Sequence, residues 1–174
     1  MVDKIVNFDL LKNIVLVAFK AGKAVMEIYN NDFSVSEKKP NHPITQADIK
    51  SHSIIEDAIK NLIPNAQFFS EESESISWEK RKLWKTYWLV DPLDGTKDFI
   101  KRNGEFTINI ALIDNYCPVL GVVYAPYMSK MYFAAQGIGS FMKTVNIQDK
   151  NIIIECDLKL EINKLEKNNE ILQI

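Results

Sequence analysis

Cysteine and histidine are scarce in this sequence, and positive charge is not in excess. The chain has two cysteines and two histidines among 174 residues, and its formal net charge is -2. Cys117 and Cys156 form no C-x-x-C pair, so neither a zinc knuckle nor a disulfide framework is indicated. His42 and His52 are too few and too far apart for a zinc site, and we interpret both as structural or exposed. The weak negative charge argues against nucleic acid as a main partner, because phosphate backbones require a strong positive excess.

Long apolar runs and a leader pattern are also missing. No apolar run approaches the roughly 18 residues that a membrane-spanning helix requires. The first residues do not show the basic and then apolar order of a signal peptide. We therefore expect a cytoplasmic protein, which agrees with the few cysteines. These observations leave peripheral association with a membrane open.

Two long helices are predicted in the first third of the chain. Apolar residues make up 47% of the sequence, which is enough for one core or a large part of a bigger one. Small and apolar residues recur every three or four positions over 11–28, where Gly22 permits a close neighbour. A second helix is predicted from Thr45, with Asp48 as its capping partner, up to the breaker Pro64.

Short β-like runs dominate the rest of the sequence. The polar stretch SEKKPNHPIT between the helices is predicted to be a connection or a short hairpin. DNYCP is typical of a hairpin turn, so part of the sheet is predicted to be antiparallel. The fold class is therefore α+β, with the two helices packed on one face of a largely antiparallel sheet. Strands are predicted at 67–69, 87–90, 107–113, 119–124 and 131–134.

Acidic residues stand at the ends of three predicted elements. Asp48 begins the second helix, Glu71 and Glu72 follow the strand QFF, and Asp91 and Asp94 follow YWLV. Each has an ordinary structural explanation, namely a capping box, a solvated loop or a turn N-cap. Taken together they are harder to explain in this way, because a carboxylate after a buried strand needs a cation or a full set of donors. Mg²⁺ is the natural cation for an all-oxygen site.

The segment DPLDGT at 91–96 has the composition of a metal and phosphate site. Pro92 constrains the backbone so that the two aspartates and the Leu93 carbonyl between them can face one ion. Gly95 lets a ligand approach the main chain closely. If a helix begins there, the N–H groups of Gly95 and Thr96 form an anion site beside the metal. A phosphate bridging magnesium ions is the expected ligand.

Three motifs together resemble the N-terminal signatures of the inositol monophosphatase superfamily of magnesium-dependent phosphatases: TQAD at 45–48, SEES at 70–73 and DPLDGT at 91–96. Within it, YWLVDPLDGTKDFIKRNGEFTINIALID and PVLGVVYAP are more similar to the CysQ-type 3'(2'),5'-bisphosphate nucleotidases than to the inositol enzymes. The resemblance extends from about residue 8 to about residue 140. It departs at Asp98, where a glutamate is expected.

The resemblance implies a role for each matching residue. Asp48 and Thr96 would position or activate the attacking water, and Glu71 is expected to be close enough to share that role. The N–H groups of Gly95 and Thr96 would hold the phosphate, with Lys97 also binding substrate. Glu72 would have an outer role or be solvated. The implied magnesium ligands are Glu71, Asp91, the Leu93 carbonyl and Asp94.

Several basic and aromatic residues have two open interpretations. Lys97, Lys101 and Arg102 could meet the second phosphate of a bisphosphorylated nucleotide, or they could form a solvated basic face. Trp84 and Trp88 are expected to fill a core or an interface. The run EKRKLWK is predicted to face solvent.

The last part of the sequence departs from the superfamily pattern. The W-D-x-x-A motif of the family's second half is missing, and the chain ends on the apolar run NNEILQI. We therefore expect a C-terminally truncated product, with a metal- and phosphate-binding domain at 1–145 and the start of an incomplete second domain at 146–174. The fold implied is the first half of the layered sugar-phosphatase fold. Apolar surface left bare by the truncation would favour self-association.

Three functions follow from the resemblance. The first is magnesium-dependent removal of the 3'-phosphate of adenosine 3',5'-bisphosphate, which yields AMP. The second is an inositol or other sugar monophosphatase. The third is a catalytically dead remnant that binds metal and phosphate at most. The implied partner is a small phosphorylated substrate.

Overall fold

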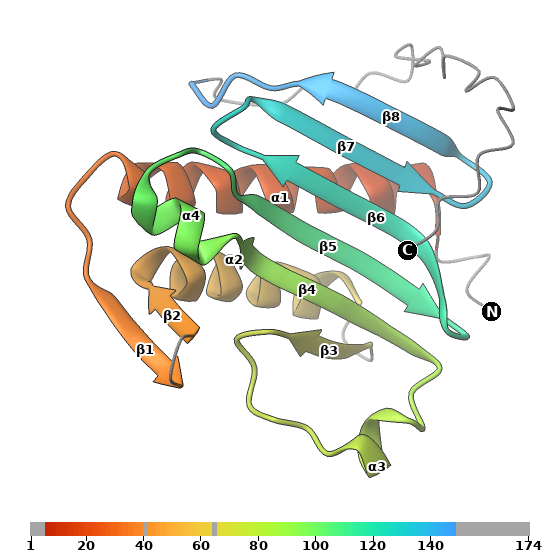
Figure 1. Cartoon of the computed structure of the whole chain (residues 1–174). Coiled ribbons are helices and arrows are strands. Elements are labelled where there is room, and N and C mark those ends of the chain that lie inside the picture. Colours follow the sequence, from red (N-terminus) through yellow and green to blue (C-terminus); the bar gives the residue numbers. More distant parts are fainter. Residues whose placement is uncertain (1–5, 40–41, 64–65, 149–174) are drawn as a thin grey trace, which may run out of the picture.

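The computed structural model describes residues 6–39, 42–63 and 66–148. Two long helices lie against one face of a six-stranded sheet, and a small two-stranded hairpin lies beside them (Figure 1). This arrangement confirms the predicted α+β class. In chain order the elements are α1 (Phe8–Tyr29), β1 (Val35–Lys39), β2 (His42–Thr45), α2 (Gln46–Leu62), β3 (Gln67–Ser70), α3 (Trp78–Arg81), β4 (Thr86–Asp94), α4 (Thr96–Lys101), β5 (Thr107–Asp114), β6 (Cys117–Ala125), β7 (Lys130–Ala135) and β8 (Gly139–Thr144).

The two long helices begin at well-formed caps. The Asn7 side chain accepts a hydrogen bond of 2.8 Å from the Leu10 N–H at the start of α1. Thr45 and Asp48 form the predicted capping box at the start of α2. Helix α2 ends at Leu62, close to its predicted limit. Local sequence signals therefore explain where both helices lie.

The large sheet has the strand order β3-β4-β5-β6-β7-β8. Strands β3 and β4 are parallel, and every later neighbouring pair is antiparallel, as largely predicted. The β5–β6 turn lies at the predicted DNYCP position, where Asn115 and Tyr116 have φ angles of 47° and 67°. Edge strand β8 was not predicted, because its mixed sequence GSFMKT has no clear alternation. The predicted connection between the helices is the β1–β2 hairpin.

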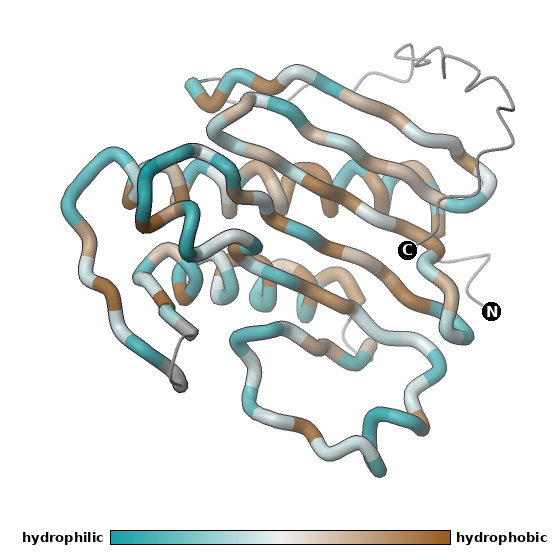
Figure 2. The backbone as a smooth tube through the Cα atoms, viewed as in Figure 1, coloured by the Kyte–Doolittle hydropathy of each residue, from teal (hydrophilic) through white to brown (hydrophobic). Residues whose placement is uncertain are grey.

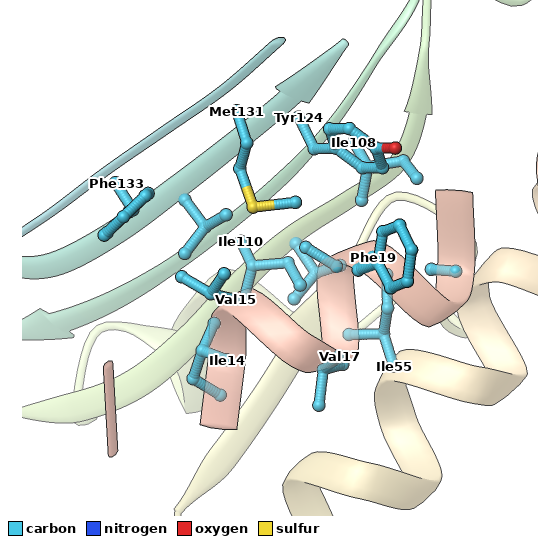
Figure 3. Packing of buried hydrophobic residues seen from close by; sticks show 14 of the residues in the cluster. Ile14, Val15, Val17, Phe19, Ile55, Ile108, Ile110, Tyr124, Met131 and Phe133 are labelled. Atoms are coloured by element: carbon cyan, nitrogen blue, oxygen red, sulfur yellow. The ribbon is translucent and has the colours of Figure 1, made fainter. Parts of the chain in front are cut away.

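The core lies between α1, α2 and the covered face of the sheet (Figure 3). Ile14 and Val15 are fully buried, and the Phe19 and Tyr124 rings pack with centroids 6.3 Å apart. Gly22 permits this approach, as predicted, because an added Cβ would lie 2.2 Å from the Tyr124 ring. Trp88 is also fully buried, which confirms its predicted place in the core.

Within the described residues no long helix covers the other face of the sheet, and the short α3 contacts it at the β3 edge, through Arg81 and Phe69. Four apolar side chains on this open face are exposed: Leu89 (41%), Val123 (42%), Tyr132 (47%) and Met142 (39%). Figure 2 shows that hydrophobic residues recur along the sheet strands, whereas the short α3 segment is largely hydrophilic. None of the described helices is long and apolar enough to cross a membrane. The described part of the chain ends just after Val145, which is buried, so most of the predicted second domain lies outside the described residues.

Candidate metal and phosphate site

The two aspartates of DPLDGT lie within strand β4, although the sequence predicted that this strand would end at Val90. Pairing with β5 continues through Asp91, opposite Asn109, and resumes at Asp94, opposite Thr107. From Asp91 to Asp94 strand β4 advances by three residues, whereas β5 advances by two, so the pairing is irregular between the two aspartates. Such an irregularity redirects side chains at the end of a strand. Asn109 also donates a hydrogen bond of 3.4 Å to the Asp94 carboxylate.

The structure brings Glu71, Asp91 and Asp94 together. The pKa of Asp91 is raised to about 7, mainly by burial and then by the neighbouring charges of Glu71 and Asp94. The Leu93 N–H, 3.2 Å from the Asp91 Oδ1, opposes this rise only in part. Glu71 is held near β4 because its N–H donates to the Val90 carbonyl at 3.2 Å. These carboxylates therefore repel one another unless a proton or a cation lies between them.

Asp48 has both of the roles considered for it. One carboxylate oxygen accepts hydrogen bonds from the Thr45 N–H (2.8 Å) and hydroxyl (2.6 Å), which is the capping interaction. The other accepts a hydrogen bond of 3.0 Å from the Thr96 hydroxyl. Asp48 is 2% exposed, so these contacts lie in a protected environment. The Thr96 hydroxyl is also 3.2 Å from the Leu93 carbonyl. Because it has one proton, it donates a strong hydrogen bond to only one of these two acceptors at a time.

Gly95 is required by the backbone conformation at the end of β4. Its φ of +91° lies in the left-handed region, and an added Cβ would be 2.7 Å from the Glu105 carbonyl oxygen. This packing gives Gly95 a structural role in addition to the approach of a ligand that the sequence predicts. Helix α4 begins at the next residue, which meets the condition for an anion site there, and the Asp98 and Phe99 N–H groups both donate to the Gly95 carbonyl at 2.9 Å. Helix geometry leaves the N–H groups before them available to a ligand.

The donor set at this site fits a hard divalent cation. Glu71, Asp91 and Asp94 supply carboxylate oxygens, and the Leu93 carbonyl lies on the same segment; Mg²⁺ prefers such oxygens. As placed, the described residues contain no group of three or more acidic, histidine or cysteine side chains that already converges on one ion. The raised pKa of Asp91 shows that its ionised form is costly beside Glu71 and Asp94 without a balancing positive charge.

The basic residues after DPLDGT separate into two kinds. Lys97 is exposed beside the start of α4, and the Lys101 Nζ lies 3.8 Å from the Asp98 carboxylate. Arg102 is exposed, as a residue of a solvated basic face would be, but it also makes specific contacts. Its guanidinium donates to the carbonyls at the end of α1, those of Tyr29 and Asn31, and lies over the Phe33 ring at 5.0 Å. Arg102 is therefore a structural link between α4 and α1.

The run EKRKLWK faces solvent only in part. Its Arg81 guanidinium lies 4.7 Å above the Phe69 ring, and the Arg81 Nε donates to the Ile76 carbonyl at 3.0 Å. Trp84 packs edge-on against Phe69, with ring centroids 6.4 Å apart. These contacts attach α3 to the edge of the sheet beside β3.

Four polar residues that lie around the site were assigned no role in it from the sequence. Ser51, His52, Ser70 and Asn109 each contact one of the segments that carry predicted site residues. The helical spacing of Ser51 and His52 from Asp48 is a signal that could have identified two of them, because residues three and four apart share a helix face.

Comparison with protein families gives one match. The model described as "Inositol monophosphatase family" matches residues 8–171. The chain is 52% identical over 130 residues to 3'(2'),5'-bisphosphate nucleotidase CysQ of Escherichia coli (strain K12), covering 74% of this chain and 52% of that relative. The chain therefore spans about half the length of this relative.

Solved structures give the same result. The crystal structure of CysQ from Bacteroides thetaiotaomicron matches with a TM-score of 0.71 and 36% identity, covering 85% of this chain and 54% of that one. The extragenic suppressor protein suhB from Bartonella henselae matches with a TM-score of 0.69 and 32% identity, covering 79% of this chain and 53% of that one. Both likenesses show that this chain shares the fold of these proteins over most of its length.

Proposed function

The chain belongs to the inositol monophosphatase family, and we propose that the protein it represents is a magnesium-dependent phosphatase of the CysQ type. Its substrate would be adenosine 3',5'-bisphosphate, from which it removes the 3'-phosphate. The observation that carries this proposal is the cluster of Glu71, Asp91 and Asp94 beside the Asp48–Thr96 pair. Similarity to relatives named bisphosphate nucleotidases supports the substrate.

Glu71, Asp91, the Leu93 carbonyl and Asp94 would hold the metal. When bound, magnesium lowers the pKa of a coordinated water and stabilises negative charge on a leaving oxygen. Phosphate monoesters hydrolyse so slowly unaided that roughly 20 kcal/mol or more of barrier reduction is needed. A cluster of carboxylates that repel one another favours a cation that can supply such charge stabilisation.

Asp48 and Thr96 would orient the attacking water and receive its proton. The Thr96 hydroxyl donates to Asp48 at 3.0 Å, so its oxygen lone pairs are free to accept a hydrogen bond from a water. When the Thr96 oxygen takes a proton from that water, it can pass its own hydroxyl proton to the Asp48 carboxylate, so Thr96 stays neutral and Asp48 becomes protonated. The buried position of Asp48 keeps this pair aligned.

The start of α4 would hold the phosphate. The N–H groups of Gly95 and Thr96 precede the first helical donors, and an anion there is favoured by these donors. Lys97 is exposed next to them and would add a positive charge for the substrate. This arrangement would orient the ester relative to the water held by Thr96.

A second candidate is an inositol or other sugar monophosphatase, favoured by the family to which the chain belongs. The test is turnover of adenosine 3',5'-bisphosphate and inositol 1-phosphate, with and without Mg²⁺. Both the 174-residue chain and a chimera are assayed; the chimera adds the part of the Escherichia coli relative that this chain does not match.

We expect the chimera to require Mg²⁺ and to show a higher kcat/KM for the bisphosphate. A higher kcat/KM for inositol 1-phosphate would favour the second candidate. Magnesium binding without turnover of either ester by the chain or the chimera would instead identify a binding remnant.

A further inference from the structure

Helix α2 presents three polar residues on one face, and each contacts a different segment of the candidate site. Asp48, Ser51 and His52 have the i, i+3, i+4 spacing that brings side chains together on a helix. Their partners are Thr96 at the start of α4, the Pro92 carbonyl in β4 and Ser70 at the end of β3, at 3.0, 2.7 and 3.0 Å. One helix face therefore contacts all three segments that carry predicted site residues.

The Ser51 contact holds β4 at the point where the aspartates lie. Ser51 is fully buried, and its hydroxyl donates to the carbonyl of Pro92, the residue that follows Asp91. A buried hydroxyl that lost this acceptor would carry a desolvation cost. The bond therefore fixes the distance between α2 and the backbone on which the candidate ligands Asp91 and Leu93 lie.

The His52 contact holds the segment that carries Glu71. The His52 Nδ1 lies 3.0 Å from the Ser70 hydroxyl oxygen, which also accepts a hydrogen bond of 3.3 Å from the Glu72 N–H. The imidazole packs edge-on against Phe68, with ring centroids 5.8 Å apart, so its orientation is constrained. Ser70 is 2% exposed, so water does not compete freely for this bond.

We propose that Ser51 and His52 are positioning residues that set the spacing between Glu71 and Asp91, so that the two carboxylates can share a divalent cation. The proposal rests on the proposed magnesium site. Strands β3 and β4 are parallel neighbours in the sheet, but Glu71 lies just past the end of β3 and Asp91 lies at the irregular end of β4. Pairing between β3 and β4 ends with the bond from the Glu71 N–H to the Val90 carbonyl, so contacts from α2 add a second constraint on the two segments.

The first test is Ser51→Ala, with Ser53→Ala as its matched control. Ser53 lies on the same helix but is exposed, so both variants lose a hydroxyl and only one loses the bond to Pro92. Magnesium affinity of the 174-residue chain is measured by calorimetry, and Mn²⁺ bound in its place is examined by electron paramagnetic resonance. We expect Ser51→Ala to weaken magnesium binding about 10-fold and to alter the Mn²⁺ spectrum. This is the lower end of the roughly 10- to 100-fold loss seen when a residue that orients metal ligands is removed. Ser53→Ala should leave both unchanged.

The second test compares His52→Asn with His52→Leu. The asparagine amide reaches the position of the imidazole Nδ1 and can restore the bond to Ser70, whereas leucine fills similar space without a polar atom. We expect His52→Asn to bind magnesium within about 2-fold of the unmodified chain and His52→Leu to bind it about 10-fold more weakly.

Thermal unfolding of all four variants separates positioning from packing. If Ser51→Ala and His52→Leu lower the melting temperature but keep the original magnesium affinity and Mn²⁺ spectrum, the residues are structural only and the inference is wrong. If the unmodified chain binds neither ion, the metal site of the proposed function fails, and this inference fails with it. If the chain binds magnesium and the variants do not differ, only the inference fails.

Discussion

The core between α1 and the sheet and the segments that carry the acidic cluster both contact α2, but the core and the cluster have opposite effects on folding stability. Ile14 and Ile55 are fully buried apolar side chains, whose removal from water stabilises the folded chain. Asp91, in contrast, has a pKa raised to about 7, so its ionised form is less favourable in the folded chain than in the unfolded one. A cluster that costs stability is expected where a ligand of opposite charge is bound.

The difference also shows what each region needs from α2. The core needs only an apolar surface of the right shape, which the apolar face of the helix provides. The cluster needs particular atoms at particular positions, which Asp48 and Ser51 provide through hydrogen bonds of 3.0 and 2.7 Å. Changes in the two regions should therefore alter stability and magnesium binding independently.

The largest effect on stability is expected in the core, for Ile14→Ala. The side chain is fully buried, so its loss removes burial and leaves a cavity, which costs about 2–5 kcal/mol of unfolding free energy. The matched control is Ile49→Ala on α2, where the side chain is 57% exposed and the expected change is within about 0.5 kcal/mol. Urea denaturation measures both. Equal effects would contradict the assignment of the core.

Gly95→Ala should be an exception to this separation of core and site. The residue belongs to the candidate site, but its replacement should also lower the stability of the fold. A Cβ there combines a φ of +91° with a contact of 2.7 Å to the Glu105 carbonyl, and we expect a loss of about 2–3 kcal/mol. Gly137→Ala is the control, since its φ is +76° but no atom lies within 4 Å, so strain alone should cost about 1 kcal/mol. If the two variants unfold at the same urea concentration, crowding at Gly95 is not important.

Asp91→Asn should change stability in the opposite direction to the core variants. Removing one charge relieves repulsion from Glu71 and Asp94 and removes a buried carboxylate. After discounting for partial solvent screening, we expect about 1–2 kcal/mol of added stability at pH 8. Magnesium affinity should fall at the same time, because a candidate ligand is lost. The control, Asp57→Asn, changes an exposed carboxylate on α2 and should affect neither quantity.

The pH dependence of that gain tests its cause. The folded-state pKa of Asp91 is about 7 against an ordinary value of 3.8, so between these values the folded chain binds more protons than the unfolded chain. The Asp91 contribution therefore lowers the stability of the unmodified chain as pH rises from about 4 to about 7, and it no longer changes once both states are ionised. We expect the advantage of Asp91→Asn to be small at pH 4 and to approach its full value by pH 8. A constant difference in unfolding free energy across this range would show that charge is not the cause.

The smallest effect on stability is expected on the open face of the sheet. Val123→Thr replaces a side chain that is 42% exposed, and the unfolding free energy should change by less than about 0.5 kcal/mol. The neighbouring Val122 is 1% exposed on the helix-covered face, and Val122→Thr should cost about 1–3 kcal/mol. Sedimentation velocity at several concentrations should show weaker self-association for Val123→Thr, if the exposed apolar face drives it. Association unaffected by this change would exclude Val123 from the contact.

Sequence patterns of short range determined most of the fold and the list of candidate site residues. The capping box at Thr45 and Asp48, the periodicity over α1 and the turn at Asn115 and Tyr116 depend on residues a few positions apart, so local chemistry specifies them. The acidic motifs were visible for the same reason, and their resemblance to a phosphatase family supplied the expected roles.

Tertiary structure alone decided how these residues meet. The contacts of Thr96 with Asp48, of Ser51 with Pro92 and of Arg102 with Tyr29 join residues 48, 41 and 73 positions apart in the sequence. Strand β4 continued to Asp94 because β5 offered partners beyond Val90, which β4's own sequence does not reveal. Long-range contacts depend on how helices and strands pack, and that packing is the sum of many weak apolar contacts that no short motif encodes.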